Sequence, residues 1–246
     1  MAIEANSPPD ARGIFRTTQW SIVLNAGAND SLVAAAALEQ LCQRYWYPLY
    51  ACVRHSGYSH DDAADLTQSF FARVVQKKTF AGVEPGVARF RSFLLTALKH
   101  FMINEWQSAN RLKRGGGRQI LSLDEKADDL YRAEPSHNST PDKLFEKRWA
   151  LSVVETALAK LRIEFVVSEK PALFDVLKPT LSGEKLERGY AEIAAEFGLS
   201  ESAIKVAVHR MRKRFGEILR AEVVETIRDP AEVDDEVRHL IRALSN

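Results

Sequence analysis

The stretch that most limits the fold of this chain is residues 189–215, which read GYAEIAAEFGLSESAIKVAVHRMRKRF. Its pattern predicts a short apolar helix, a turn at Gly198-Leu199-Ser200 and a longer second helix. Gly198 can adopt the left-handed backbone that ends a helix without a Cβ clash. Ser200 is a favourable N-cap, and Glu201 places a negative charge where a helix start favours it. Two helices joined by so short a turn are typical of a helix-turn-helix.

The second predicted helix combines an apolar stripe with a basic face. Its apolar residues recur at i, i+4, i+7 and i+11, and at about 100° per residue they share one side: Ile204, Val208, Met211 and Phe215. Long cationic side chains on another side can reach phosphates and base edges of DNA. The candidate contact residues are Ser202, Lys205, His209, Arg212 and Lys213. A solvated basic surface helix is the alternative, and the small Ala194, the turn glycine and the cap favour DNA reading.

Composition excludes several classes of protein. The formal net charge is only +1, so any affinity for DNA must come from local basic clusters, at residues 111–118 and 205–214. The two cysteines, Cys42 and Cys52, predict no disulfide, and a reduced cytoplasmic setting fits them. The six histidines show no metal-ligand spacing. No apolar run is long enough to span a membrane. We therefore expect no cofactor, no metal and no membrane insertion.

The helical periodicity predicts an all-α fold of two small helical domains joined by a flexible linker. Residues 1–14 are predicted to be disordered, and residues 15–114 to form the first domain. The linker is placed at residues 115–139, which begin with three consecutive glycines. The second domain, residues 140–220, is expected to start a helix at Thr140-Pro141-Asp142, with one buried stripe of Leu151, Val154, Leu158, Leu161 and Phe165. Residues 221–246 are predicted to be a helical C-terminal extension.

The first domain carries two polar helical surfaces. Residues 60–76 read HDDAADLTQSFFARVVQ, and the residues alone fit equally a surface helix capped by Ser59 and a docking surface for a partner. Residues 89–114 keep cations and amides for solvent or a ligand, and Trp106 is assigned to the edge of the core. Cations bind phosphates and amides read base edges. These solvent- or ligand-facing residues are Arg89, Arg91, Lys99, Asn104, Gln107, Asn110, Arg111, Lys113 and Arg114.

Three blocks, taken in this order, resemble a bacterial sigma factor of the sigma-70 superfamily, of the small two-domain extracytoplasmic-function (ECF) type. DAADLTQSFFARVV is similar to the region-2 helix that grips the polymerase clamp. FRSFLLTALKHFMINEWQSANRLKR is similar to the helices that melt and read the −10 promoter element. The helix-turn-helix is similar to the region-4 unit that reads the −35 element. The resemblance spans residues 20–220.

The resemblance implies partners and residue roles. The partners would be core RNA polymerase, through its clamp and flap, and promoter DNA, with room for an anti-sigma factor as a regulator. Clamp contacts would come from Asp62, Asp65, Gln68 and Phe71. The loop 79–88 would hold a flipped −10 base, and the −10 strand would lie along Asn104, Gln107, Asn110, Arg111, Lys113 and Arg114. The −35 duplex would face Ser202, Lys205, His209, Arg212 and Lys213. Such a protein is not an enzyme.

Two other functions were weighed against this one. A helix-turn-helix repressor or activator would bind DNA without polymerase, usually as a dimer, and the sequence offers no obvious dimerisation or ligand-binding domain. A magnesium-dependent nucleic-acid enzyme could use the carboxylates at residues 61–65 or 124–129. The first group is better explained as the start of a capped helix, and the second lies in the predicted linker.

Overall fold

The computed structural model describes residues 31–76, 89–111, 124–132, 140–186, 188–227 and 229–245. These residues form the helices α2 (Ser31–His55), α3 (His60–Gln76), α4 (Phe90–Arg111), α5 (Asp124–Arg132), α6 (Pro141–Val167), α7 (Pro171–Leu177), α8 (Tyr190–Glu196), α9 (Glu201–Val224) and α10 (Val233–Ser245). Two short 3₁₀ helices, η1 (Lys178–Leu181) and η2 (Pro230–Glu232), complete the described elements. No strand occurs in these ranges, which confirms the predicted all-α fold.

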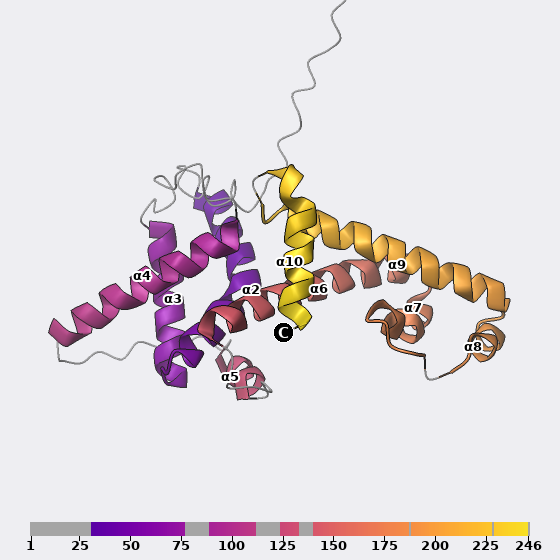
Figure 1. Ribbon diagram of the computed structural model, residues 1–246, viewed down its shortest axis with the longest axis horizontal. Helices are drawn as coiled ribbons and strands as arrows, with labels where there is room; N and C mark the ends of the chain where they lie inside the picture. The colour runs from indigo at the N-terminus through magenta and orange to yellow at the C-terminus, as the bar shows by residue number, and fades with distance from the viewer. Residues whose placement is uncertain are drawn as a thin grey trace, which may run out of the picture.

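The helices are arranged along one long axis (Figure 1). Helices α3 and α4 lie at one end, α7 and α8 lie at the other, and α6 and α9 run between them. Helix α10 crosses the middle of the molecule (Figure 1). The order follows from the connections, because the short turns after α6, α7 and α8 keep those elements together at one end.

Helix α6 is the central element and begins where the sequence predicts. The Thr140 side chain accepts a hydrogen bond from the Lys143 amide at 3.3 Å, and Pro141 occupies the first turn. The expected buried stripe is only partly right, because of its five residues Leu161 alone is fully buried. The fully buried row is Phe145, Trp149, Val153, Ala157 and Leu161. Helix α6 packs against α2, α9, α10 and α7, so its burial does not follow a single amphipathic face.

Two hydrophobic clusters hold the described helices together. The first joins α2, α3 and α4 with Phe145, Trp149 and Val153 of α6, and also takes in Val223 of α9 and Leu240 of α10. The second joins Ala157 and Leu161 of α6 with α7, α8 and the first part of α9. Helix α6 therefore contributes to both clusters. The division of the chain into separate domains at the expected boundaries stays a prediction.

A helix lies inside the segment that the sequence analysis treated as linker. Asp128 of α5 is buried, and it accepts hydrogen bonds from the Tyr50 hydroxyl at 3.2 Å and Arg54 Nη2 at 3.0 Å. Burial favours the protonated form of Asp128, but Arg54, Arg132 and the hydrogen bonds outweigh it and lower the pKa of the carboxyl. Residues 124–132 are thus held against α2 by a charged contact that composition alone does not reveal.

Candidate nucleic-acid interface

The predicted helix-turn-helix is present as α8, a turn and α9. Gly198 has φ +63°, and the Leu199 amide donates to the Ala194 carbonyl at 2.8 Å. Ser200 caps α9 by accepting from the Ala203 amide at 3.2 Å. The predicted stripe of α9 is buried at Ile204, Val208 and Met211, against Ile193 and Ala194 of α8. The local signals in the sequence therefore place this motif correctly.

The candidate contact residues of α9 are exposed on one stretch of the helix. Ser202, Lys205, His209, Arg212 and Lys213 all lie at the surface. Three of them make contacts within the fold, and the first is Ser202, whose Oγ lies 2.9 Å from Ser200 Oγ. Lys205 Nζ is 2.6 Å from Glu201 Oε1, and this hydrogen bond raises the pKa of the lysine. Arg212 donates from Nε at 3.1 Å and Nη2 at 2.9 Å to the carbonyl of Thr180 in η1. Lys213 has no ion-pair partner among the described residues.

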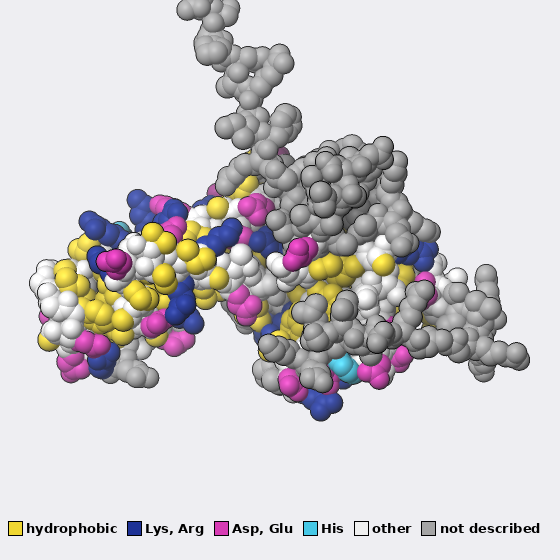
Figure 2. All heavy atoms as spheres, turned by 180° about the vertical axis from the view of Figure 1, so that it is seen from behind, with side chains coloured by type: hydrophobic (Ala, Val, Ile, Leu, Met, Phe, Trp, Pro, Cys, Tyr) yellow, Lys and Arg dark blue, Asp and Glu magenta, His cyan; other side chains and the backbone are white. Residues whose placement is uncertain are grey.

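An apolar groove of about 570 Å³ lies beside this basic face, between α6, α7 and α9. Its lining includes the apolar residues Phe165, Leu173, Leu199, Val206 and Met211 together with Arg210 and Arg214. Arg214 Nη2 is 2.6 Å from Glu164, so that cation is already paired. Figure 2 shows hydrophobic side chains bordered by both basic and acidic side chains at the end of the molecule formed by α7, α8 and the start of α9. This end can therefore receive an apolar side chain as well as a phosphate backbone.

Helix α4 presents the second candidate surface. Asn104 and Gln107 are exposed, and so is Trp106, with 62% of its surface accessible. The assignment of Trp106 to the edge of the core was wrong, because the side chain is largely exposed and belongs to neither hydrophobic cluster. The side chains of Asn110 and Arg111, and all of Lys113, Arg114 and the loop 79–88, lie outside the described residues.

A second hollow, of about 440 Å³, opens between α3 and α4. Phe70, Phe93 and Phe101 line it, with Arg73, His100 and Asn104 as polar groups. The Arg73 guanidinium stands over the Phe101 ring at 5.6 Å and is 3.3 Å from Glu105. Aromatic walls with polar groups among them suit a flat ring that carries hydrogen-bonding edges.

The candidate clamp contacts lie on α3. Asp62, Asp65 and Gln68 are exposed, whereas Phe71 is buried in the first cluster. Ser59 caps the helix as predicted, accepting from the Asp62 amide at 3.1 Å. Phe71 can therefore only support this surface from beneath.

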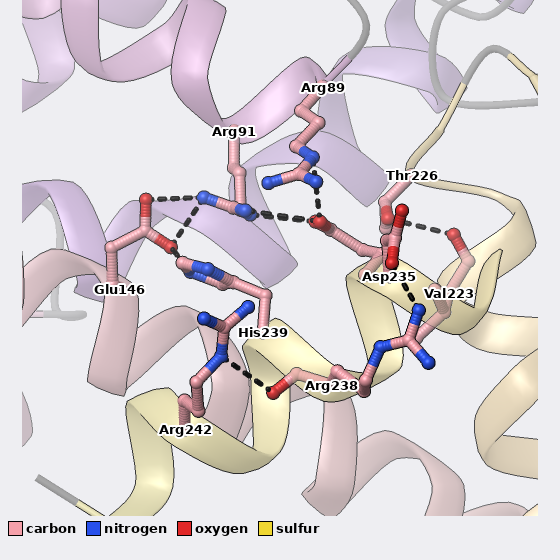
Figure 3. A network of polar contacts seen from close by, with 10 residues as sticks. Arg89, Arg91, Glu146, Val223, Thr226, Asp235, Arg238, His239 and Arg242 are labelled. Atoms are coloured by element: carbon pink, nitrogen blue, oxygen red, sulfur yellow. Dashed lines mark hydrogen bonds and ion pairs between the residues drawn. The ribbon is translucent and has the colours of Figure 1, made fainter. Parts of the chain in front are cut away.

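One cation expected to face solvent or a ligand does neither. The side chain of Arg91, at the start of α4, is only 3% exposed, and it lies between Glu236 of α10 and Glu146 of α6 (Figure 3). Sequence reasoning missed this because the two carboxylates are 145 and 55 residues away in the chain.

No cluster of metal-ligating side chains occurs in the described part of the chain. A membrane-crossing helix is not found among the described helices, since none is both long enough and apolar enough.

Comparisons with known proteins gave one finding. A protein-family model described as "ECF sigma factor" matches residues 34–221, which include α3, α4, α8 and most of α9. Searches of curated proteins and of solved structures gave no match.

Proposed function

The chain belongs to the ECF sigma factor family, which makes it a non-enzymatic transcription initiation factor, and we propose that it directs core RNA polymerase to promoters by reading both a −10 and a −35 element. The observation that carries the proposal is the exposed basic face of α9, on the second helix of a helix-turn-helix. This geometry suits insertion of the helix into the major groove of duplex DNA.

The −35 element would be read by the first half of α9. Lys213 and His209 are exposed and can reach phosphates without breaking an ion pair among the described residues. Lys205 must first leave Glu201, and Arg212 can use only Nη1 while it holds the Thr180 carbonyl. Phosphate contacts position such a helix, and contacts to base edges supply the sequence preference.

The −10 element would be read by α4 and the hollow beside it. The exposed Asn104, Gln107 and Trp106 form a surface of amides and one large ring. The hollow between α3 and α4 offers the half-buried Phe93 for stacking, whereas Phe70 and Phe101 in its wall are buried. Flipping a base out of a duplex costs a few kcal/mol of free energy. Stacking and hydrogen bonds to the edge of the flipped base can offset this cost. An unpaired −10 base in this hollow would favour the melted promoter.

Core polymerase would bind at two places. Asp65 and Gln68 are exposed on α3 above the buried Phe71, a polar surface that suits the clamp. The apolar groove beside α9 suits an apolar side chain of the flap. Binding at either the clamp or the flap would raise the effective concentration for binding at the other. The site of action would then be the cytoplasm, where polymerase meets the chromosome.

Run-off transcription with purified core polymerase tests the proposal. Mapping of transcript starts after overexpression supplies the promoter, and the full chain is then added to core on that template. We expect a run-off transcript, and less of it with Lys213→Gln, whereas Lys143→Gln at the far end of α6 should leave it unchanged. A helix-turn-helix regulator that works without polymerase, which the family membership does not favour, would give no transcript with core alone.

A further inference from the structure

The C-terminal part of the chain ties the helix expected to read the −10 element to the rest of the molecule. Glu236 of α10 is 0% exposed and accepts from Arg91 Nε at 2.7 Å and Nη2 at 3.1 Å, while Arg89 Nε lies 3.1 Å from the same carboxylate. Arg91 Nη1 also donates to Glu146 of α6 at 2.6 Å, and His239 Nε2 is 2.8 Å from Glu146. Figure 3 shows Arg91 held between α6 and α10.

The arginine at the centre of this network stays charged. Burial opposes the charge of Arg91, but its hydrogen bonds and attraction to Glu236 and Glu146 outweigh burial and raise its pKa. The guanidinium also lies over the Trp149 ring at 4.7 Å. Removing one partner from a buried ion pair is strongly destabilising, because the other charge is left without compensation. The contact between α4 and α10 therefore resists opening.

A second buried carboxylate makes an equivalent connection on α9. Glu222 is 1% exposed and accepts from Arg44 Nη2 of α2 at 2.5 Å, and it is also bonded to Lys160 of α6. The backbone continues this connection, since the Phe90 amide donates to the Thr226 carbonyl at 3.3 Å. Leu240 of α10 and Val223 of α9 are buried in the first hydrophobic cluster. Helices α2, α4, α6 and α9 are thus joined by one continuous set of buried contacts.

These contacts leave both expected reading surfaces open. Asn104 and Gln107 of α4 and Ser202, His209 and Lys213 of α9 remain exposed, and the two surfaces lie toward opposite ends of the long axis (Figure 1). A segment that blocked DNA binding would cover one of them. The contacts instead connect the two ends through α6, which at 27 residues is about 40 Å long.

We propose that residues 222–227 together with α10, here named the C-terminal brace, fix the distance and angle between α4 and the first half of α9, and so make promoter spacer length a recognised feature. The inference rests on the proposed function. One base pair changes the separation of two elements by about 3.4 Å and their relative orientation by about 34°. If the two reading helices are held rigidly, they match only one spacer length. If they are joined flexibly, their effective concentration at the second element is similar for several spacer lengths.

A promoter series with the spacer changed in steps of one base pair tests the brace. Run-off transcription is measured with core polymerase and the full chain as wild type, Glu236→Gln, Leu240→Ala, and Asp235→Asn as the matched control. Asp235 lies in the same turn of α10 and pairs with Arg238 of its own helix. Hydrogen exchange of α10 in each free protein reports whether the brace has opened.

We expect wild type and Asp235→Asn to lose on the order of tenfold when the spacer is two base pairs off its best length, and the brace variants to lose only about threefold. Poor folding of a variant lowers transcription in equal proportion at every spacer, so the ratio between spacers is unaffected by it. Leu240→Ala provides the same test without a buried charge, should Glu236→Gln fold poorly.

Two results would overturn the brace. One is an unchanged spacer profile in variants whose α10 exchanges freely, which would assign the spacing to polymerase alone. The other is full protection of α10 in a Glu236→Gln, Leu240→Ala double variant, which would show that these contacts do not hold it. Absence of any transcript with the wild-type chain would instead contradict the proposed function.

Discussion

Replacement of Arg212 by alanine should change two separate quantities, because the residue is placed for two tasks. Its Nε and Nη2 donate to the carbonyl of Thr180, a residue only 3% exposed, and so hold η1 to α9. Its Nη1 has no partner among the described residues, so this nitrogen is free to donate to a phosphate. The first task predicts a loss of stability, and the second predicts a weaker dependence of DNA binding on salt.

The loss of stability can be scaled from the two hydrogen bonds. A hydrogen bond from a charged donor contributes about 1.5–3 kcal/mol when well formed, and since Arg212 is exposed we take about 1–2 kcal/mol for Arg212→Ala. In a chain of this size that corresponds to a fall in Tm of about 2–8 °C. Loss of one phosphate contact lowers the slope of log K against log salt by about 0.9.

Thermal unfolding and salt-dependent fluorescence anisotropy on a −35 duplex measure the two effects independently. Lys213→Ala is the matched variant, since it should reduce the slope similarly and leave Tm unchanged. Arg212→Lys should keep the slope and lose part of the stability. An unchanged Tm for Arg212→Ala refutes the role in holding η1, and a lower Tm with an unchanged slope refutes the contact with DNA.

Three further changes test the surfaces on α9, α3 and α5. Glu201→Gln should tighten binding to the −35 duplex about two- to fivefold at low salt, because it frees Lys205 and removes a negative charge; equal or weaker anisotropy-derived affinity contradicts this. Asp65→Ala should weaken binding to core polymerase without lowering Tm, whereas the exposed Asp61→Ala serves as control; native affinity in a pull-down titration rejects the clamp contact. The lowered pKa of Asp128 means that its stabilising charge is present above the pKa of the unfolded side chain and is lost as the pH falls through the folded value. The stability difference between wild type and Asp128→Asn, measured by thermal unfolding, should therefore be constant near neutral pH and shrink below about pH 4, and a difference that does not shrink is evidence against the charged contact.

The sequence was sufficient wherever the structure depends on near neighbours. Gly198 and Ser200 act through hydrogen bonds to residues three positions away, and the stripe from Ile204 to Met211 packs against the neighbouring α8. The same holds for Thr140 at the start of α6. These features depend on residues that are close together in the sequence. The helix-turn-helix and the all-α fold could therefore both be predicted.

Contacts between distant residues were not predictable in the same way. Arg91 meets Glu236 across 145 residues, and nothing in the pattern of α4 distinguishes it from the cations that remain at the surface. The stripe of α6 was misplaced because that helix is packed on several sides, which removes the single amphipathic face that periodicity detects. Trp106 was assigned to the edge of the core because large aromatic residues are highly buried on average, whereas this side chain is exposed on α4.

The two buried carboxylates Glu222 and Glu236 are neutralised by neighbouring cations, so they take little from the basic surface of α9. Glu222 and Glu236 are matched inside the molecule by Arg44, Lys160, Arg89 and Arg91. The electric fields of two paired opposite charges largely cancel at a distance. These ion pairs therefore add little to the electrostatic potential at the two ends of the molecule. The cations of α9 are therefore not opposed by these acids, although the balance of the whole chain is nearly neutral. It follows that the acids of the C-terminal brace can fix the geometry of the molecule without weakening its attraction for phosphates.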